Sequence, residues 1–135
     1  MADSLEKLVE QFQKIMAHAW MVRTFVKHSE EVEDYPDLME IVRAVFDMSR
    51  AIESKAVNPA EYFRFAGKKI GRLKKASQQF QQDAWKASTH TNFHQAVVSI
   101  QAAVEQMESI LEQVAQLRNQ NSAPDVQITE GPDEG

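Results

Sequence analysis

The sequence predicts an all-α protein, namely an antiparallel up-down-up-down four-helix bundle with a disordered C-terminal tail. Glycine and proline each occur only four times in 135 residues, whereas average usage gives about nine glycines and about seven prolines. Apolar residues recur every three or four positions in four successive segments, which is the spacing of one helix face. We expect residues 1–118 to form the bundle and residues 119–135 to form a flexible acidic tail.

The first predicted helix runs from about Ser4 to His28 or Val32. Asp3 followed by Glu6 has the form of a capping box, in which the two side chains accept hydrogen bonds from backbone groups at the start of a helix. Its apolar stripe consists of Leu5, Leu8, Val9, Phe12, Ile15, Met16, Ala19, Val22 and Val26. This stripe predicts one face that packs against the other helices.

Proline marks the starts of the next two predicted helices. The second runs from Pro36 to about Glu53, because proline cannot continue a helix but suits its first position. The third begins after Asn58, whose side chain can cap it, and Pro59 occupies the first helical position. Glu61 completes the pattern of a capping box. We therefore expect sharp helix starts at both prolines.

A short turn is predicted between the third helix and a fourth helix that runs from about Thr91 to Arg118. The join at residues 88–92 is rich in poor helix formers, and the apolar stripe changes phase there. Thr89 or Thr91 is the expected cap, and one continuous helix over residues 59–118 is the alternative. The stripes of these three helices are Leu38, Ile41, Val42, Val45, Ser49 and Ile52; Phe63, Ala66, Ile70, Leu73, Ser77, Phe80, Ala84 and Ala87; and Phe93, Val97, Ile100, Val104, Met107, Leu111 and Val114.

Composition excludes several classes of protein. The chain has no cysteine, which rules out disulfide scaffolds, thiolate zinc sites and cysteine nucleophiles. It has no stretch of eighteen apolar residues, and charged residues near its start argue against a signal peptide. We therefore expect a cytoplasmic protein without membrane insertion. The net charge is −5, and residues 1–118 hold fifteen bases and sixteen acids, so net charge gives no reason to expect nucleic acid as a partner.

Surplus apolar residues predict a protein–protein interaction surface. Trp20, Met21 and Phe25 lie off the main stripe of the first helix, and a second stripe of the fourth helix includes Ile110 and Leu117. Extra apolar faces on a small domain mark interfaces, and Met and Trp are favoured there. The leading expectation is therefore a non-enzymatic interaction protein that binds itself or another protein, most simply as a homodimer.

A divalent metal site is the first alternative function. His90 and His94 have the spacing that lets two imidazoles bind one metal ion from a single helix face. In the predicted topology, Asp83 reaches the same end of the bundle and is the candidate third ligand. No other cofactor is expected.

A phosphate or nucleic-acid surface is the second alternative. The third predicted helix carries six bases between positions 64 and 75, with no acid among them. Arg64, Lys68, Arg72 and Lys75 line the face opposite its apolar stripe. No aromatic residue is interleaved on that face of the helical wheel, so we expect no platform for stacking bases.

Arg23 and His28 show an Arg-x4-His spacing that resembles the motif of helical ribonucleases of the HEPN class. The resemblance implies that these two side chains would act together on RNA. In that family the motif lies in the later part of the bundle, whereas here it lies in the first helix. The sequence also lacks a nucleophile elbow and a His-Glu-x-x-His motif, so it favours a role without catalysis.

Overall fold

The computed structural model describes residues 2–121, and every regular element among them is helical, as the sequence predicts. The long helices are α1 (Ala2–Lys27), α3 (Met39–Ile52), α4 (Pro59–Ala87) and α5 (Thr91–Asn121). Shorter elements are α2 (Glu31–Asp34) and the 3₁₀ turns η1 (Pro36–Leu38) and η2 (Glu53–Lys55). Within these residues, no helix has both the length and the apolar character needed to cross a membrane.

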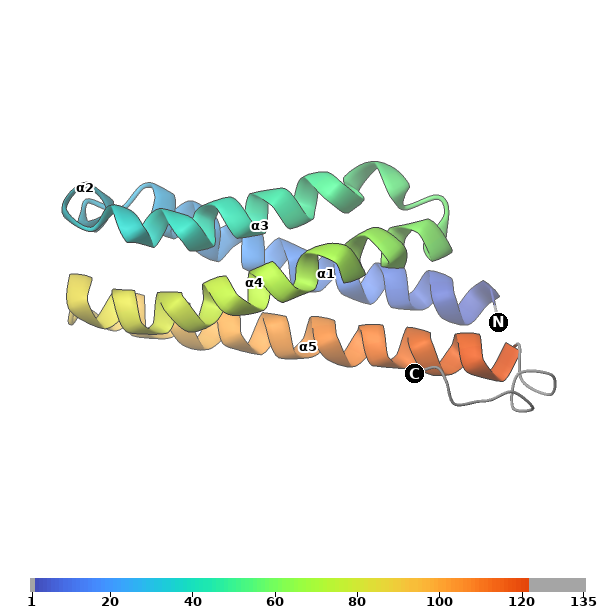
Figure 1. The fold of residues 1–135 in the computed structure, drawn as a ribbon. Coiled ribbons are helices and arrows are strands. Elements are labelled where there is room, and N and C mark those ends of the chain that lie inside the picture. The colour runs from blue at the N-terminus through green and yellow to red at the C-terminus, as the bar shows by residue number, and fades with distance from the viewer. Residues whose placement is uncertain (1, 122–135) are drawn as a thin grey trace.

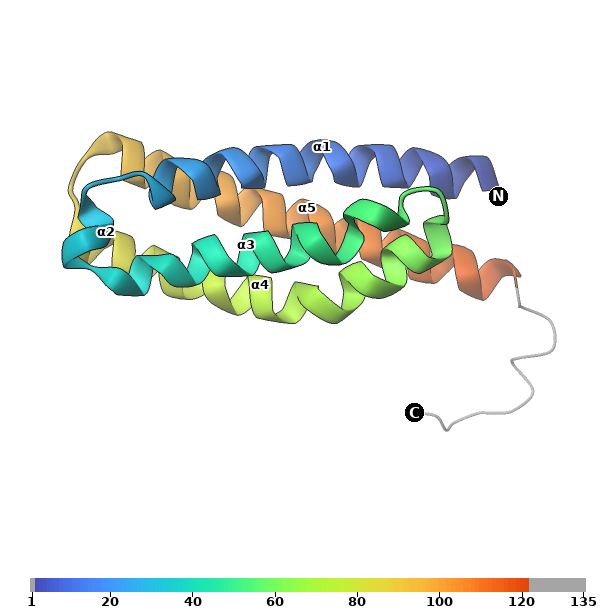
Figure 2. The same ribbon diagram turned by 90° about the horizontal axis from the view of Figure 1, so that it is seen from above.

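The four long helices lie side by side and share one long axis (Figures 1 and 2). Helix α3 packs on α1, α4 on α3 and α5 on α4, and α5 also packs on α1. The start of α1, the α3–α4 connection and the end of α5 lie at one end of the molecule. The opposite end holds α2 and the α4–α5 connection.

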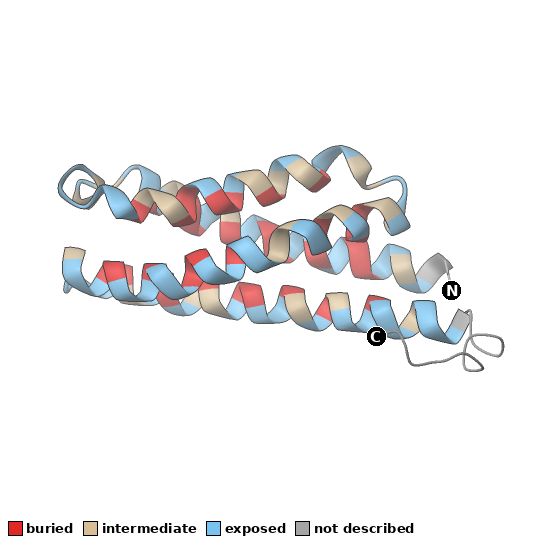
Figure 3. Cartoon of the chain, in the orientation of Figure 1, coloured by how far each residue is buried: buried red, intermediate tan, exposed pale blue. Residues whose placement is uncertain are grey.

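The interior is built from the apolar stripes, as the colouring by burial shows (Figure 3). Most of the expected stripe positions are buried, and the half-buried ones are Leu5, Ser49, Ile70, Ala87 and Leu111. Phe12 of α1 is fully buried and makes edge-to-face contacts with two rings of α4. Its ring centroid lies 5.7 Å from that of Tyr62 and 5.9 Å from that of Phe63.

The first helix ends earlier than the sequence predicts, at Lys27 rather than at His28 or Val32. The Ser29 hydroxyl donates to the carbonyl of Val26 at 2.7 Å, and the His28 ring bonds the carbonyl of Thr24 at 3.0 Å. These side chains occupy the last carbonyl groups of α1, so its final turn closes on them. The helix starts at Ala2, ahead of the predicted capping box, and the side chain of Asp3 lies outside the described residues.

The second predicted helix is divided in the structure. Pro36 starts the 3₁₀ turn η1, the α-helical part begins only at Met39, and the turn η2 follows Ile52. Proline fixes φ and lacks an N–H group, which suits it to the first turn of either kind of helix. The pattern therefore locates the segment correctly without distinguishing an α-helical turn from a 3₁₀ turn.

The start of α4 follows the prediction. Asn58 has extended backbone, and its side-chain oxygen accepts a hydrogen bond from the amide of Glu61 at 3.2 Å. In a complete capping box the Glu61 carboxylate would accept a hydrogen bond from the amide of Asn58. Here it binds the guanidinium of Arg64 at 3.0 Å instead. Asn58 thus satisfies one of the free amides of the first turn of α4.

We expect Asn58→Ala to lower the free energy of unfolding by about 1 kcal/mol, because an amide at the start of α4 loses its acceptor. Urea denaturation followed by circular dichroism measures this change. Asn119→Ala is a matched control near the end of α5, where the asparagine is exposed, and it should shift stability by less than about 0.5 kcal/mol. Equal destabilisation by the two variants would contradict the assigned cap.

A turn separates α4 and α5, which confirms the predicted break and excludes a continuous helix over residues 59–118. The cap is not the expected threonine. His90 accepts a hydrogen bond from the amide of Asn92 through Nδ1 at 3.0 Å, and its own amide donates to the Ser88 hydroxyl at 3.0 Å. Helix α5 continues to Asn121, past the predicted boundary at residue 118. The remainder of the predicted tail, residues 122–135, lies outside the described residues.

Candidate functional site

The face between α1 and α5 is hollowed along its length and carries almost no charge. Three shallow hollows follow one another, near Leu117, near Ala103 and near Met21. Lys7 is the only Lys, Arg, Asp or Glu side chain among the residues that line them. The rest of the lining is apolar or carries neutral groups such as the amides of glutamine. We call this surface the α1–α5 face.

The structure brings three of the five predicted interaction residues to the α1–α5 face. Met21 is 65% exposed, and Phe25 is 37% exposed with its ring 5.1 Å from that of Phe93. Leu117 is half-buried and lines the hollow near the opposite end. Ile110 is only 4% exposed, so its predicted place on an exposed surface is corrected to the core. The second stripe of α5 is buried there because α5 packs against both α1 and α4.

Trp20 lies on a different side of α1 from Met21, against α3. Its ring centroid is 6.3 Å from that of Phe46, and the Arg23 guanidinium lies 4.1 Å from the Trp20 ring and 5.6 Å from the Phe46 ring. Arg23 is 8% exposed, and its Nε atom is buried without a hydrogen-bond partner. Trp20 therefore packs with Arg23 between α1 and α3 rather than on the α1–α5 face.

The Arg23–His28 pair does not assemble into one site. Arg23 is held between two aromatic rings, whereas the His28 ring bonds the carbonyl of Thr24 in its own helix. No contact joins Arg23 to His28 in the part of the chain that the structure describes. The geometry gives no support to the nuclease chemistry that the resemblance implies.

The three predicted metal ligands are engaged separately. Asp83 is 6% exposed and accepts from the Gln79 amide at 3.0 Å, while its other carboxylate oxygen is buried without a partner. His90 caps α5 through Nδ1, and the His94 ring lies tilted against that of Trp85, with the two centroids 4.0 Å apart. Over residues 2–121, no three His, Asp or Glu side chains are arranged to hold a metal ion. Metal binding stays a prediction without an assembled set of ligands.

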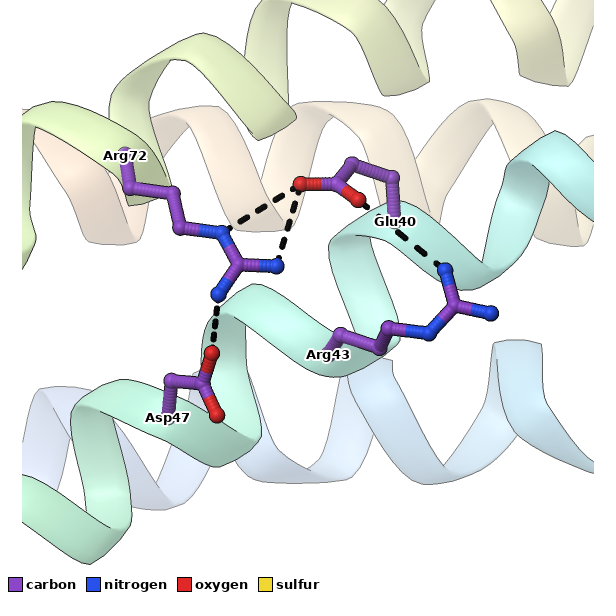
Figure 4. Close-up of polar contacts among 4 residues, drawn as sticks. All are labelled: Glu40, Arg43, Asp47 and Arg72. Atoms are coloured by element: carbon purple, nitrogen blue, oxygen red, sulfur yellow. Dashed lines mark hydrogen bonds and ion pairs between the residues drawn. The ribbon is translucent and has the colours of Figure 1, made fainter.

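The basic stripe of α4 is partly neutralised by acids of α3 (Figure 4). Arg72 donates through Nε and a terminal nitrogen to one carboxylate oxygen of Glu40, at 3.3 and 3.2 Å, and also pairs with Asp47. Glu40 is in turn 4.0 Å from Arg43. Arg72 thus ties α4 to α3. Of the other bases in the predicted stripe, Arg64 pairs with Glu61, and Lys68 and Lys75 are exposed.

Sequence reasoning missed an aromatic ring among these bases. Phe65 is half-buried, and three cationic groups lie close to its ring centroid: Lys55 Nζ at 4.9 Å, the Arg64 guanidinium at 4.8 Å and Lys68 Nζ at 5.1 Å. We call these four residues the Phe65 cluster. No aromatic was expected on that face of the helical wheel, yet the Phe65 ring reaches two of its bases, Arg64 and Lys68. Phe65 is off the apolar stripe, and Lys55 comes from η2, so no local pattern links them.

Glu61 is the acid beside the Phe65 cluster. Its hydrogen bond to Arg64 lowers the pKa of the Glu61 carboxyl below its ordinary value, and the nearby charges of Arg64, Lys55 and Lys68 lower the pKa further. At neutral pH the cluster therefore contains three cations facing a single carboxylate, which Arg64 already binds.

Comparison of the chain with known protein families, with curated proteins and with solved structures finds no match. We therefore infer function from two surfaces of the molecule, the α1–α5 face and the Phe65 cluster.

Proposed function

We propose that the chain is an antiparallel up-down-up-down four-helix bundle whose role is self-association, and that its α1–α5 face binds the same face of a second copy. The packing of each long helix on the next, closed by α5 on α1, supports this topology. The observation that carries the function is the exposure of Met21 and Phe25 on a hollowed face that is nearly free of charge.

Charge favours this face over the others as the contact between copies. Each copy carries a net charge of −5, so two copies repel one another wherever like charges face each other. On the α1–α5 face this repulsion is small, because Lys7 is its single charged lining residue. A twofold contact would also bury the same apolar side chains on both copies.

We expect the parent chain to be a dimer and Met21→Glu to be a monomer in sedimentation equilibrium at micromolar concentration. The variant places a carboxylate within the proposed contact, at the exposed apolar side chain of the hollow near Phe25, where it would be buried in both copies. Because Met21 is 65% exposed within one chain, the fold of the single copy should tolerate the change.

Val57→Glu is the matched control. It adds the same charge at a residue that is 95% exposed, in the connection between η2 and α4, and it should remain dimeric. A monomeric parent chain would overturn the proposal, and so would a Met21→Glu variant that dimerises as tightly as the parent.

A further inference from the structure

The α3–α4 side of the molecule carries the positive charge of an otherwise acidic chain. Residues 41–82 contain nine Lys and Arg residues and three Asp and Glu residues. Near the end where α4 starts, this excess is concentrated in the Phe65 cluster. Arg64 has Glu61 as its partner, but Lys55 and Lys68 form no ion pair with any residue that the structure describes. Cations held around one ring repel each other unless an anion lies among them.

We propose that the Phe65 cluster is a binding site for an acidic peptide segment, and that its occupant is the C-terminal segment of this same chain, residues 122–135. The segment contains four acids, Asp125, Glu130, Asp133 and Glu134, and no Lys or Arg. Its charge is therefore complementary to the cluster, and it belongs to the same molecule. This inference is independent of the proposed dimer, because the cluster lies on α4 and η2 rather than on the α1–α5 face.

The segment starts close to the cluster. Lys74 of α4 contacts Glu108 of α5. Gln81, seven residues later in α4, contacts Gln101, seven residues earlier in α5. This antiparallel register places Phe65 about level with residue 117, one helical turn before the end of α5. An extended chain spans about 3.3 Å per residue, so roughly four residues, 122–125, are enough to cross one helix diameter of about 10 Å and reach the cluster.

The sequence of the segment suits both parts of the cluster. When residues 125–130 are extended, alternate side chains point to the same side, so Val126 and Ile128 can cover the exposed part of the Phe65 ring. Glu130 lies on that same side and supplies a carboxylate for Lys55 or Lys68. Charge-assisted hydrogen bonds between ammonium and carboxylate groups are the stronger kind.

A tethered occupant has an advantage over a free anion. A short flexible linker holds a ligand at an effective concentration of about the millimolar level. An external polyanion must displace the segment before it reaches the Phe65 ring. We therefore expect residues 122–135 of the same chain to occupy the site. Changing the charge of this segment should change how readily an external polyanion binds to the cluster.

Paramagnetic relaxation measures the contact directly, and the absence of cysteine makes the labelling unambiguous. A nitroxide is attached to the full chain through Thr129→Cys, and amide signals are recorded by two-dimensional ¹⁵N NMR. We expect selective loss of signal around residues 55–68 with retention in the half of α1 that ends at Lys27, which lies at the opposite end of the molecule. The loss should disappear in 1 M salt, where the screening length is about 3 Å.

The matched variants decide the outcome. Lys55→Glu/Arg64→Glu/Lys68→Glu should restore the signals, whereas Lys14→Glu/Lys27→Glu/Lys86→Glu, which makes the same charge change at exposed lysines elsewhere, should not. Signal loss that persists in the cluster variant would overturn the proposal. The absence of selective loss would also overturn it, whether or not a single-stranded oligonucleotide binds to the cluster. So would loss seen only when labelled and ¹⁵N-enriched chains are mixed.

Discussion

Phe12→Ala is expected to lower the free energy of unfolding by about 3–5 kcal/mol, the usual cost of removing a large buried aromatic side chain. The ring is fully buried and contacts Tyr62 and Phe63 edge to face. Its loss opens a cavity between α1 and α4, which otherwise touch each other little across the interior. Urea denaturation of the parent and the variant, followed by circular dichroism, gives the difference.

Val98→Ala is the comparison for this measurement. Val98 lies on α5 and is 59% exposed, so its truncation should change stability by less than about 0.5 kcal/mol. A cost below about 1 kcal/mol for Phe12→Ala would mean that the ring is not enclosed. The stripe that assigns one face of α1 to the interior would then be wrong.

The positions that form the core were predictable because each helix carries its own pattern. The stripe from Leu8 to Val26 can be predicted from the geometry of a single helix. Its burial is expected whichever helix packs against it. The break before α5 was predictable for the same reason, since the stripe changes phase there. Helix ends were predicted less well, because they depend on single hydrogen bonds such as that from Ser29 to the carbonyl of Val26.

The candidate surfaces were predictable only in part, because a surface is made by several helices. Trp20 and Met21 are neighbours in sequence, and successive residues in a helix are about 100° apart around its axis. That rotation turns Trp20 toward Phe46 of α3 and leaves Met21 exposed beside α5. The sequence of α1 does not state which neighbouring helix lies on which side. The same limit hid Phe65 among bases that come from two elements.

We expect the free energy of unfolding to fall as pH rises above 10, through Tyr62. Burial raises the pKa of the Tyr62 phenol above its ordinary value of 10.0. Above pH 10 the unfolded chain has released this proton and the folded chain still holds it, so the unfolded state binds fewer protons and gains stability. Below pH 10, the contribution of Tyr62 to the free energy of unfolding is fully present. Above pH 10 it falls by about 1.4 kcal/mol per pH unit until the folded state also ionises.

Denaturation of the parent and Tyr62→Phe at pH 9 and at pH 11 isolates this contribution from that of the other groups that titrate there. Tyr62→Phe keeps the ring that packs on Phe12 and Phe63, and it should lose markedly less stability than the parent between the two pH values. Tyr35→Phe makes the same change at a residue that is 40% exposed, and it should follow the parent. Identical pH dependence in all three chains would show that the Tyr62 hydroxyl reaches water in the folded state, and hence that the contact of α1 with the start of α4 is looser than its buried rings indicate.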